Sequence, residues 1–153
     1  LHTELGHNFR LTNLQAAIGL GQLERIAGII AKKRRMGQAY TEKLREIKGI
    51  QLPVEESWAK QVYWMYGIVL AEATGWDAKT LAQKLWMHGI DTRPFFLGMH
   101  EQPVLRNLGL FSGEKYPITE RIARQGLYLP SGLTLTEGQI GLICESLKES
   151  LDN

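Results

Sequence analysis

The run at residues 62–70 restricts the possible folds more than any other part of the sequence. It is rich in aromatic and β-branched residues, and both of its alternating faces are apolar. A strand of this kind must be covered on both sides by other parts of the chain. A helix that Asp77 caps and Gly89 ends follows it, and then a second strand at 90–93, which Pro94 stops. A strand, a helix and a strand within about 35 residues are typical of an α/β or α+β domain.

The residues before this run predict a helical arm. Thr12 and Gln15 are spaced as a capping box, in which each side chain accepts a hydrogen bond from the backbone of the other residue. Apolar residues then recur at steps of three and four along 16–30, and a second stripe of this kind occupies 36–47. The spacing predicts a long helical region with a bend near Gly37.

We expect residues 1–49 to form a loop and this arm, and residues 50–153 to form a small α/β domain that makes one compact unit with it. Gly49 is a typical helix stop, and Pro53 prevents the helix from resuming. The second part predicts a small mixed sheet flanked by helices. Its further predicted elements are an irregular segment at 95–113, a helix at 117–125, a short strand at 127–129 and a closing helix after a second capping box at Thr136 and Gln139.

The composition describes an ordinary globular protein. The 153 residues are 44% apolar and 22% charged, which is enough for one domain with a core. The net charge of +2 gives no reason to expect nucleic acid or an anionic membrane as a partner. The basic run at 32–35 has no aromatic stacking platform beside it, and we interpret it as the solvated face of a helix.

Cysteine usage and the chain's beginning bear on its cellular setting. Cys144 is the only cysteine and lies among apolar residues, so we expect a core position in a cytoplasmic protein without disulfides. No apolar run is long enough to span a membrane, and no signal peptide opens the chain. The chain begins with Leu1 rather than Met, and we expect it to be a piece of a longer protein.

The loop before the first helix contains the first candidate binding residues. Asn8 and Arg10 lie beside Gly6 and directly before the capped helix start at Thr12. An amide and a cation on a stiff loop suit a phosphate or a carboxylate ligand. The spacing alone leaves open a solvated loop that satisfies only its own backbone.

Arg93 and His100 are the second pair of candidates. Arg93 lies at the end of a predicted strand, and His100 lies in the irregular segment that follows. A cation and an imidazole that converge after a strand end would suit an anionic substrate such as a nucleoside diphosphate. Two plainer interpretations stay open, in which Arg93 pairs with a nearby carboxylate and His100 caps a loop.

We expect no metal site. His2 and His7 flank Glu4, but two histidines on a short loop lack a third ligand. Neither an H-E-x-x-H nor a C-x-x-C pattern occurs in the sequence.

Segments spread over nearly the whole chain match one family signature. Residues 6–19 read GHNFRLTNLQAAIG, and 22–25 read QLER. Four later segments follow in the same order: VYWMY at 62–66, GIDTRPFF at 89–96, MHEQP at 99–103 and RQGLYLPSG at 124–132. In these segments the chain resembles the DegT/DnrJ/EryC1/StrS sugar aminotransferases, which use pyridoxal 5'-phosphate (PLP). The later segments are most similar to the perosamine-synthase-like branch, which aminates a GDP-linked 4-keto-6-deoxy sugar.

The resemblance implies a fold like the C-terminal domain of fold-type I aminotransferases. It also implies a homodimer that transfers an amino group from glutamate to a nucleotide-linked keto-deoxysugar, for amino-sugar and O-antigen polysaccharide synthesis. In such a dimer Asn8 crosses to the phosphate of the partner's PLP. Arg10 meets an anionic group, either that phosphate or the carboxylate of the amino donor. Arg93 and His100 lie in segments that match the nucleotide-sugar pocket.

The groups that perform the reaction in this family have no counterpart in this sequence. The lysine that forms the Schiff base with PLP lies in the N-terminal domain of family members, and none of the nine lysines here has a matching context. We therefore expect that lysine upstream of Leu1, no catalytic residue in this chain, and neither PLP binding nor catalysis by this chain alone. The alternative is a stand-alone, non-catalytic binding or dimerisation module of the same fold. Two departures are His7, where Tyr is common, and Gly98, where Pro is common and whose flexibility could loosen the segment that presents His100.

Overall fold

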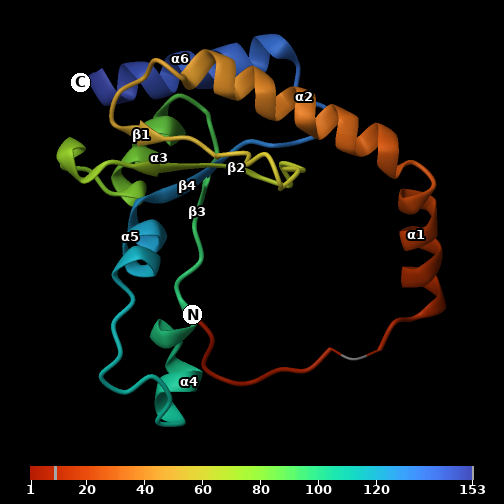
Figure 1. Cartoon of the computed structure of the whole chain (residues 1–153), viewed down its shortest axis with the longest axis vertical. Helices are drawn as coiled ribbons and strands as arrows, with labels where there is room; N and C mark the ends of the chain where they lie inside the picture. Colours follow the sequence, from red (N-terminus) through yellow and green to blue (C-terminus); the bar gives the residue numbers. More distant parts are fainter. Residues whose placement is uncertain (9, 153) are drawn as a thin grey trace.

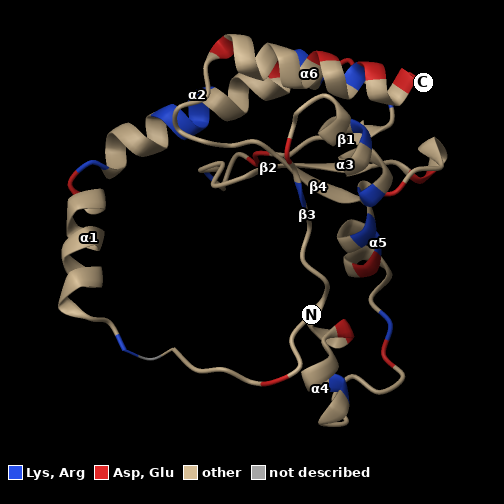
Figure 2. Ribbon diagram, turned by 180° about the vertical axis from the view of Figure 1, so that it is seen from behind, with Lys and Arg blue, Asp and Glu red and all other residues tan. Residues whose placement is uncertain are grey.

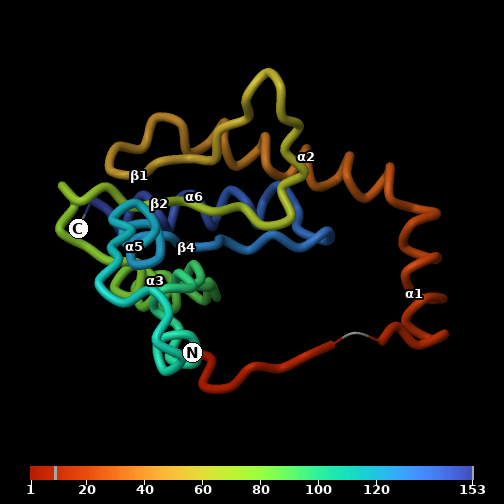
Figure 3. The backbone as a smooth tube through the Cα atoms, turned by 60° about the horizontal axis from the view of Figure 1, so that its bottom comes forward, coloured from red at the N-terminus to blue at the C-terminus, as the bar shows by residue number. Residues whose placement is uncertain are grey.

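The computed structural model describes residues 1–8 and 10–152, and it contains a helical arm beside a four-stranded sheet with its own helices (Figure 1). The arm consists of α1 (Asn13–Leu23) and α2 (Ile26–Leu44). The capping box predicted for α1 is present, because the Thr12 amide donates to Gln15 Oε1 over 2.8 Å and the Gln15 amide to Thr12 Oγ1 over 3.3 Å. The C-terminal half of α2 packs on the body, whereas α1 stands away from it (Figures 1 and 3).

The arm breaks at a different place from the one predicted. The prediction of a bend near Gly37 is wrong, since α2 runs through this residue and the break lies at Glu24 and Arg25. Gly37 instead makes room for a neighbouring ring: a Cβ added there would lie 2.5 Å from Cγ of Tyr63. The glycine therefore serves the packing of a loop against α2.

The other helices lie in the body of the molecule. They are α3 (Ala78–Met87), α4 (Pro103–Asn107), α5 (Pro117–Gln125) and α6 (Glu137–Asp152), with 3-10 turns η1 (Glu72–Thr74) and η2 (Met99–Glu101). Asp77 caps α3 as predicted, because its carboxylate accepts the Thr80 amide over 2.8 Å. The second capping box is also confirmed, with the Gln139 amide donating to Thr136 Oγ1 over 3.3 Å. None of the helices in the described ranges is long and apolar enough to cross a membrane.

The four strands form one sheet in the order β1-β2-β4-β3. They are β1 (Ile50–Gln51), β2 (Tyr66–Leu70), β3 (Arg93–Pro94) and β4 (Gly126–Leu129), and every pair of neighbours is antiparallel. The predicted class of a small sheet with flanking helices is confirmed. The sheet is not mixed as expected, because β4 lies between β2 and β3 and separates the two strands that run in the same direction. With α3 as the crossover, β2 and β3 make a split βαβ unit.

Both strands of this unit are shorter than predicted. β2 begins only at Tyr66, because the backbone of Tyr63 has φ +49° and cannot continue an extended strand. β3 begins at Arg93, because the Ile90 amide still donates to the carbonyl of Leu85 and so completes the end of α3.

Different elements cover the two faces of β2, as its apolar alternation predicted. Tyr66, Ile68 and Leu70 are fully buried in the core that α2, α3 and α6 complete. Cys144 of α6 belongs to this core, and burial raises the pKa of its thiol to about 11. On the opposite face, Phe95 stacks on Tyr128 of β4 with 4.3 Å between ring centroids, and α5 packs beside them.

The basic run on α2 is not simply a solvated helix face, as the sequence suggested. Figure 2 shows it as the blue part of α2 near the body. The ammonium group of Lys33 donates to the carbonyl of Trp64 over 2.9 Å and to that of Ser131, and burial lowers the pKa of Lys33. Arg34 pairs with Glu55 over 2.9 Å. Half of the run therefore fastens two loops to α2.

Candidate functional site

Residues 1–8 leave the body near α4 as an irregular segment, and residues 10–12 lead into α1 (Figures 1 and 3). Asn8 and Arg10 both lie exposed on this loop, and Phe9 between them lies outside the described residues. Among the described residues, neither the Asn8 amide nor the Arg10 guanidinium has a hydrogen-bond or ion-pair partner. The loop therefore presents two strong polar groups that the rest of the described chain does not use.

The helix that follows this loop, α1, is exposed along its whole length. All residues of α1 are described, none is buried, and none is charged. Leu14, Ile18, Leu20 and Leu23 each expose more than half of their surface, between 58% and 72%. An uncharged helix with a large exposed apolar surface is typical of a protein–protein contact.

Both ends of the loop are fixed. At its α1 end, the capping box holds Thr12 to the first turn of α1. At its other end, the His2 amide donates to Gln102 Oε1 over 3.1 Å, and the Val104 amide donates to the His2 carbonyl over 3.0 Å. Asn8 and Arg10 thus lie between two attachment points on the folded chain.

Arg93 lines a surface depression of about 240 Å³ at one end of the sheet. Trp64 and Met65, residues 91–93 and residues 128–131 surround this depression. Lys33 stabilises two of its walls, because the Trp64 and Ser131 carbonyls that accept from its ammonium group belong to them. Among the described residues the Arg93 side chain has no ion pair, so the open alternative of a nearby carboxylate partner is not what the structure shows.

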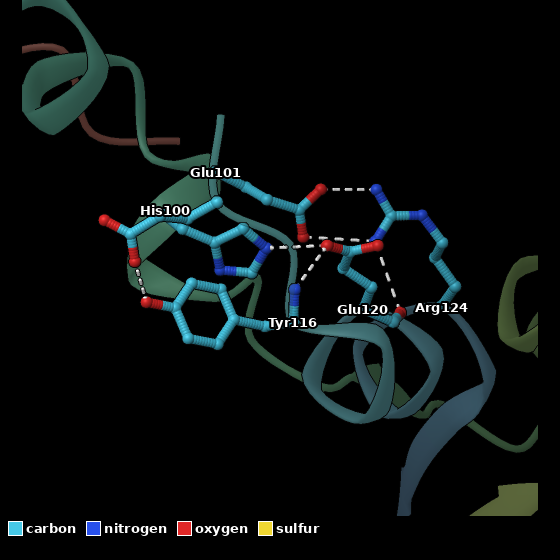
Figure 4. A network of polar contacts seen from close by, with 6 residues as sticks. His100, Glu101, Tyr116, Glu120 and Arg124 are labelled. Carbon is cyan, nitrogen blue, oxygen red and sulfur yellow. Dashed lines mark hydrogen bonds and ion pairs between the residues drawn. The ribbon is translucent and has the colours of Figure 1, made fainter. Parts of the chain in front are cut away.

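His100 occupies a different environment. Only 9% of its surface is exposed, its Nε2 lies 3.2 Å from Glu120 Oε1, and its ring packs on Tyr116 with 4.8 Å between centroids (Figure 4). His100 is not among the residues that line the Arg93 depression. The two predicted substrate residues are therefore not brought together in one pocket.

The packing of His100 depends on Gly98. A Cβ added to Gly98 would lie 2.5 Å from Cε1 of the His100 ring and 2.8 Å from Cγ2 of Thr119. The missing side chain makes room for the imidazole. Gly98 therefore allows a close contact here, which differs from the loosening that its flexibility suggested.

An ion pair that the sequence did not reveal lies next to His100. Both carboxylate oxygens of Glu101 accept from the guanidinium of Arg124, one of them over 3.1 Å, and this bonding lowers the pKa of Glu101 (Figure 4). Glu120 accepts the Tyr116 amide over 3.0 Å, which is the main cause of its own lowered pKa. The spacing of Glu120 and Arg124 on a predicted helix predicts an ion pair between these two side chains. Arg124 pairs with Glu101 instead, and no spacing in the sequence pointed to that partner.

The described residues hold no metal-like cluster. In residues 1–8 and 10–152, no three His, Cys, Asp or Glu side chains gather as potential ligands.

Comparisons with known proteins agree over almost the whole chain. The sequence pattern of the DegT/DnrJ/EryC1/StrS aminotransferase family matches residues 1–148. The GDP-perosamine synthase of Escherichia coli O157:H7 is 34% identical over 148 residues, and that of Caulobacter vibrioides is 33% identical over the same length. These matches cover 97% and 96% of this chain but only 38% and 39% of the two relatives.

A solved structure agrees with these relatives. The structure of DesI in the presence of its TDP-sugar product has a TM-score of 0.75 and 27% sequence identity to this chain. The match covers 90% of this chain and 35% of that one. The chain therefore spans little more than a third of the length of the proteins that it matches.

Proposed function

Because the chain belongs to the DegT/DnrJ/EryC1/StrS aminotransferase family, we propose that it forms the C-terminal part of a PLP-dependent enzyme that aminates a nucleotide-linked keto-deoxysugar. The proposed substrate is a GDP-4-keto-6-deoxymannose-like sugar, because the two curated relatives described above are GDP-perosamine synthases. The proposed amino donor is glutamate, as the family resemblance implies. The product would serve amino-sugar and polysaccharide synthesis in the cytoplasm.

The observation that carries this proposal is that the side chains of Asn8 and Arg10, on the loop before α1, have no hydrogen-bond or ion-pair partner among the described residues. An exposed amide at Asn8 and an exposed guanidinium at Arg10 fit a phosphate dianion, and a guanidinium also fits a carboxylate in a two-pronged contact. Asn8 would bind the phosphate of the PLP held by the partner subunit. Arg10 would bind the same phosphate or the carboxylate of glutamate. PLP, when bound, supplies the electron sink for amino-group transfer.

The homodimer is supported by α1. This uncharged helix exposes Leu14, Ile18, Leu20 and Leu23, and burying one leucine side chain of this kind contributes about 1.5–3 kcal/mol. Because α1 directly follows the loop of Asn8 and Arg10, a partner subunit that covers α1 also approaches these two residues.

Arg93 is the proposed contact for the anionic part of the nucleotide sugar. Its depression is open, and its guanidinium is not used by a carboxylate among the described residues. His100 faces Glu120 instead of the depression. We therefore assign His100 to holding the segment beside the pocket, and it would contact substrate only after leaving Glu120.

The Schiff-base lysine is proposed to lie upstream of Leu1. The first test is to read the coding DNA before the Leu1 codon. The proposal expects an open frame for roughly 200 further residues, the size of a large domain, with a lysine in a Schiff-base context. A start codon directly before Leu1 would favour the stand-alone module and overturn the proposal.

The second test measures PLP binding by the full-length dimer. Asn8→Ala should weaken PLP affinity about tenfold, because one charge-assisted hydrogen bond contributes about 1.5 kcal/mol. Asn107→Ala is the matched control, since Asn107 is an exposed asparagine at the end of α4. Equal PLP affinity in the wild type and Asn8→Ala would contradict the assigned cofactor contact.

A further inference from the structure

Gln102 lies at the junction of η2 and α4, and its own backbone is held on both sides. Its amide donates to the carbonyl of Met99 over 3.1 Å, and its carbonyl accepts the amides of Leu105 and Arg106, each over 3.1 Å. Only 7% of the residue is exposed. The backbone of Gln102 is therefore held in place, and the residue is buried.

This side chain binds the N-terminal segment. Gln102 Oε1 accepts the His2 amide over 3.1 Å, and Gln102 Nε2 donates to the carbonyl of Leu97 over 3.4 Å. The Val104 amide donates to the His2 carbonyl over 3.0 Å. Both backbone polar groups of His2 are thus bonded to residues 102–104, which makes His2 a fixed point.

The turn η2, which directly precedes Gln102, is attached to α5. His100 and Glu101, both in η2, contact Glu120 and Arg124 of α5 (Figure 4). Gln102 follows these two residues directly. The contacts of η2 with α5 therefore fix the position of Gln102, and Gln102 in turn fixes the position of His2 in the N-terminal segment.

The geometry has a consequence for Asn8 and Arg10. Asn8 follows His2 by six positions, a length of chain that spans at most about 20 Å when extended. Because His2 is bonded to residues 102–104, residues 3–8 start from a fixed point and sample fewer conformations than a segment with a free end. Restraint before binding raises affinity, since less ordering remains to be done when the ligand arrives.

We propose that Gln102 is a positioning residue, which holds the loop of Asn8 and Arg10 at the correct place for the anionic group that this loop binds. The inference rests on the proposed function, because it takes that group to be the phosphate of PLP. Gln102 acts through His2 and the loop and does not touch the cofactor.

The test compares Gln102→Met, which keeps the size of the side chain but removes its acceptor, with Gln102→Glu, which keeps an acceptor for the His2 amide. Gln83→Met is the matched control, because Gln83 is exposed on α3. Amide hydrogen exchange at Val104 reports the attachment of His2 directly. We expect exchange at least about tenfold faster in Gln102→Met, with wild-type rates in Gln83→Met and largely restored rates in Gln102→Glu.

The second measurement is the affinity of the full-length dimer for PLP, in a cycle with Asn8→Ala. Gln102→Met should weaken PLP binding about tenfold, and it should add little further loss in the Asn8→Ala background. A merely structural role would instead lower the thermal midpoint and give losses that add.

The outcomes separate the two proposals. If Asn8→Ala weakens PLP binding and Gln102→Met leaves it unchanged, or if the two losses add, this inference is overturned and the proposed function stands. If Asn8→Ala leaves PLP binding unchanged, the proposed cofactor contact is wrong and the inference falls with it. If Gln102→Met fails to fold, weak PLP binding by folded Gln102→Glu, despite its retained acceptor, would overturn the inference.

Discussion

His100 and Glu120, twenty residues apart in the sequence, are joined by a contact of 3.2 Å between Nε2 and Oε1. The same carboxylate oxygen accepts the amide of Tyr116, the N-cap residue of α5, over 3.0 Å. The Glu120 side chain therefore binds both the start of α5 and the turn η2. Glu101, the neighbour of His100, is paired with Arg124 of α5. The turn η2 is therefore attached to α5 at two consecutive residues.

We predict that this attachment weakens in acid. The pKa of Glu120 is lowered chiefly by the Tyr116 amide, and that of Glu101 by the Arg124 guanidinium. A carboxylate with a lowered pKa stabilises the folded chain above its unfolded pKa, here near 4.5, and this contribution is lost as the pH falls through the folded pKa. Protection of the amides at residues 99–105 from exchange, taken relative to their intrinsic exchange rates at each pH, should therefore fall below about pH 4.5. In Glu101→Gln/Glu120→Gln it should depend less on pH, and an equal dependence would refute the prediction.

A side chain at position 98 should destabilise the fold. The backbone of Gly98 has φ −60° and ψ 153°, which alanine adopts readily, so the contacts of the new methyl group with the His100 ring and with Cγ2 of Thr119 oppose the change. Gly98→Ala should lose about 1–3 kcal/mol of unfolding free energy, measured in urea. Gly138→Ala is the control, because nothing lies within 4 Å of its added Cβ in α6. Adding His100→Ala should recover part of the loss; no recovery would mean that another contact causes it.

Two glycines on α2 should respond with opposite signs. Gly28 has nothing within 4 Å of an added Cβ, so Gly28→Ala should gain about 0.5–1 kcal/mol from the better helix former. Gly37→Ala should lose about 1–3 kcal/mol of unfolding free energy, because the new methyl group clashes with Cγ of the Tyr63 ring. Thermal unfolding of both variants measures these changes in stability. Higher stability of both variants would show that Tyr63 moves aside without cost.

Local signals in the sequence predicted those elements whose causes are local. The caps at Thr12, Asp77 and Thr136 all form, and the two capping boxes form with the expected glutamines. Gly37 misled the prediction because its role depends on Tyr63, a residue 26 positions away that reaches α2 only in the folded chain. The antiparallel sheet was likewise out of reach, since the insertion of β4 between β2 and β3 is a property of topology and not of any strand's own pattern.

The candidate site divides in the same way. Residue type and the family signature led to Asn8, Arg10 and Arg93, which the structure leaves exposed and unpaired among the described residues. His100 has the same kind of chemistry, but its surroundings turn it toward Glu120. Gln102 lies in the family segment at 99–103, but nothing in the sequence indicated its role, because a single glutamine gives no periodicity and its partner His2 is 100 residues away.

The last prediction concerns the depression beside β3. If Arg93 binds the diphosphate of the nucleotide sugar, Arg93→Met should weaken GDP binding by the full-length enzyme about tenfold, which corresponds to about 1.4 kcal/mol. Arg93→Lys should lose less, because it keeps the charge but not the planar fork. Arg45→Met serves as the control, since Arg45 is exposed and the ion pair of its guanidinium among the described residues is with its neighbour Glu46. Titration calorimetry gives the affinities. Because a diphosphate contact is ionic, the loss should shrink as salt rises, and a loss independent of salt would indicate that Arg93 acts on the shape of the depression instead.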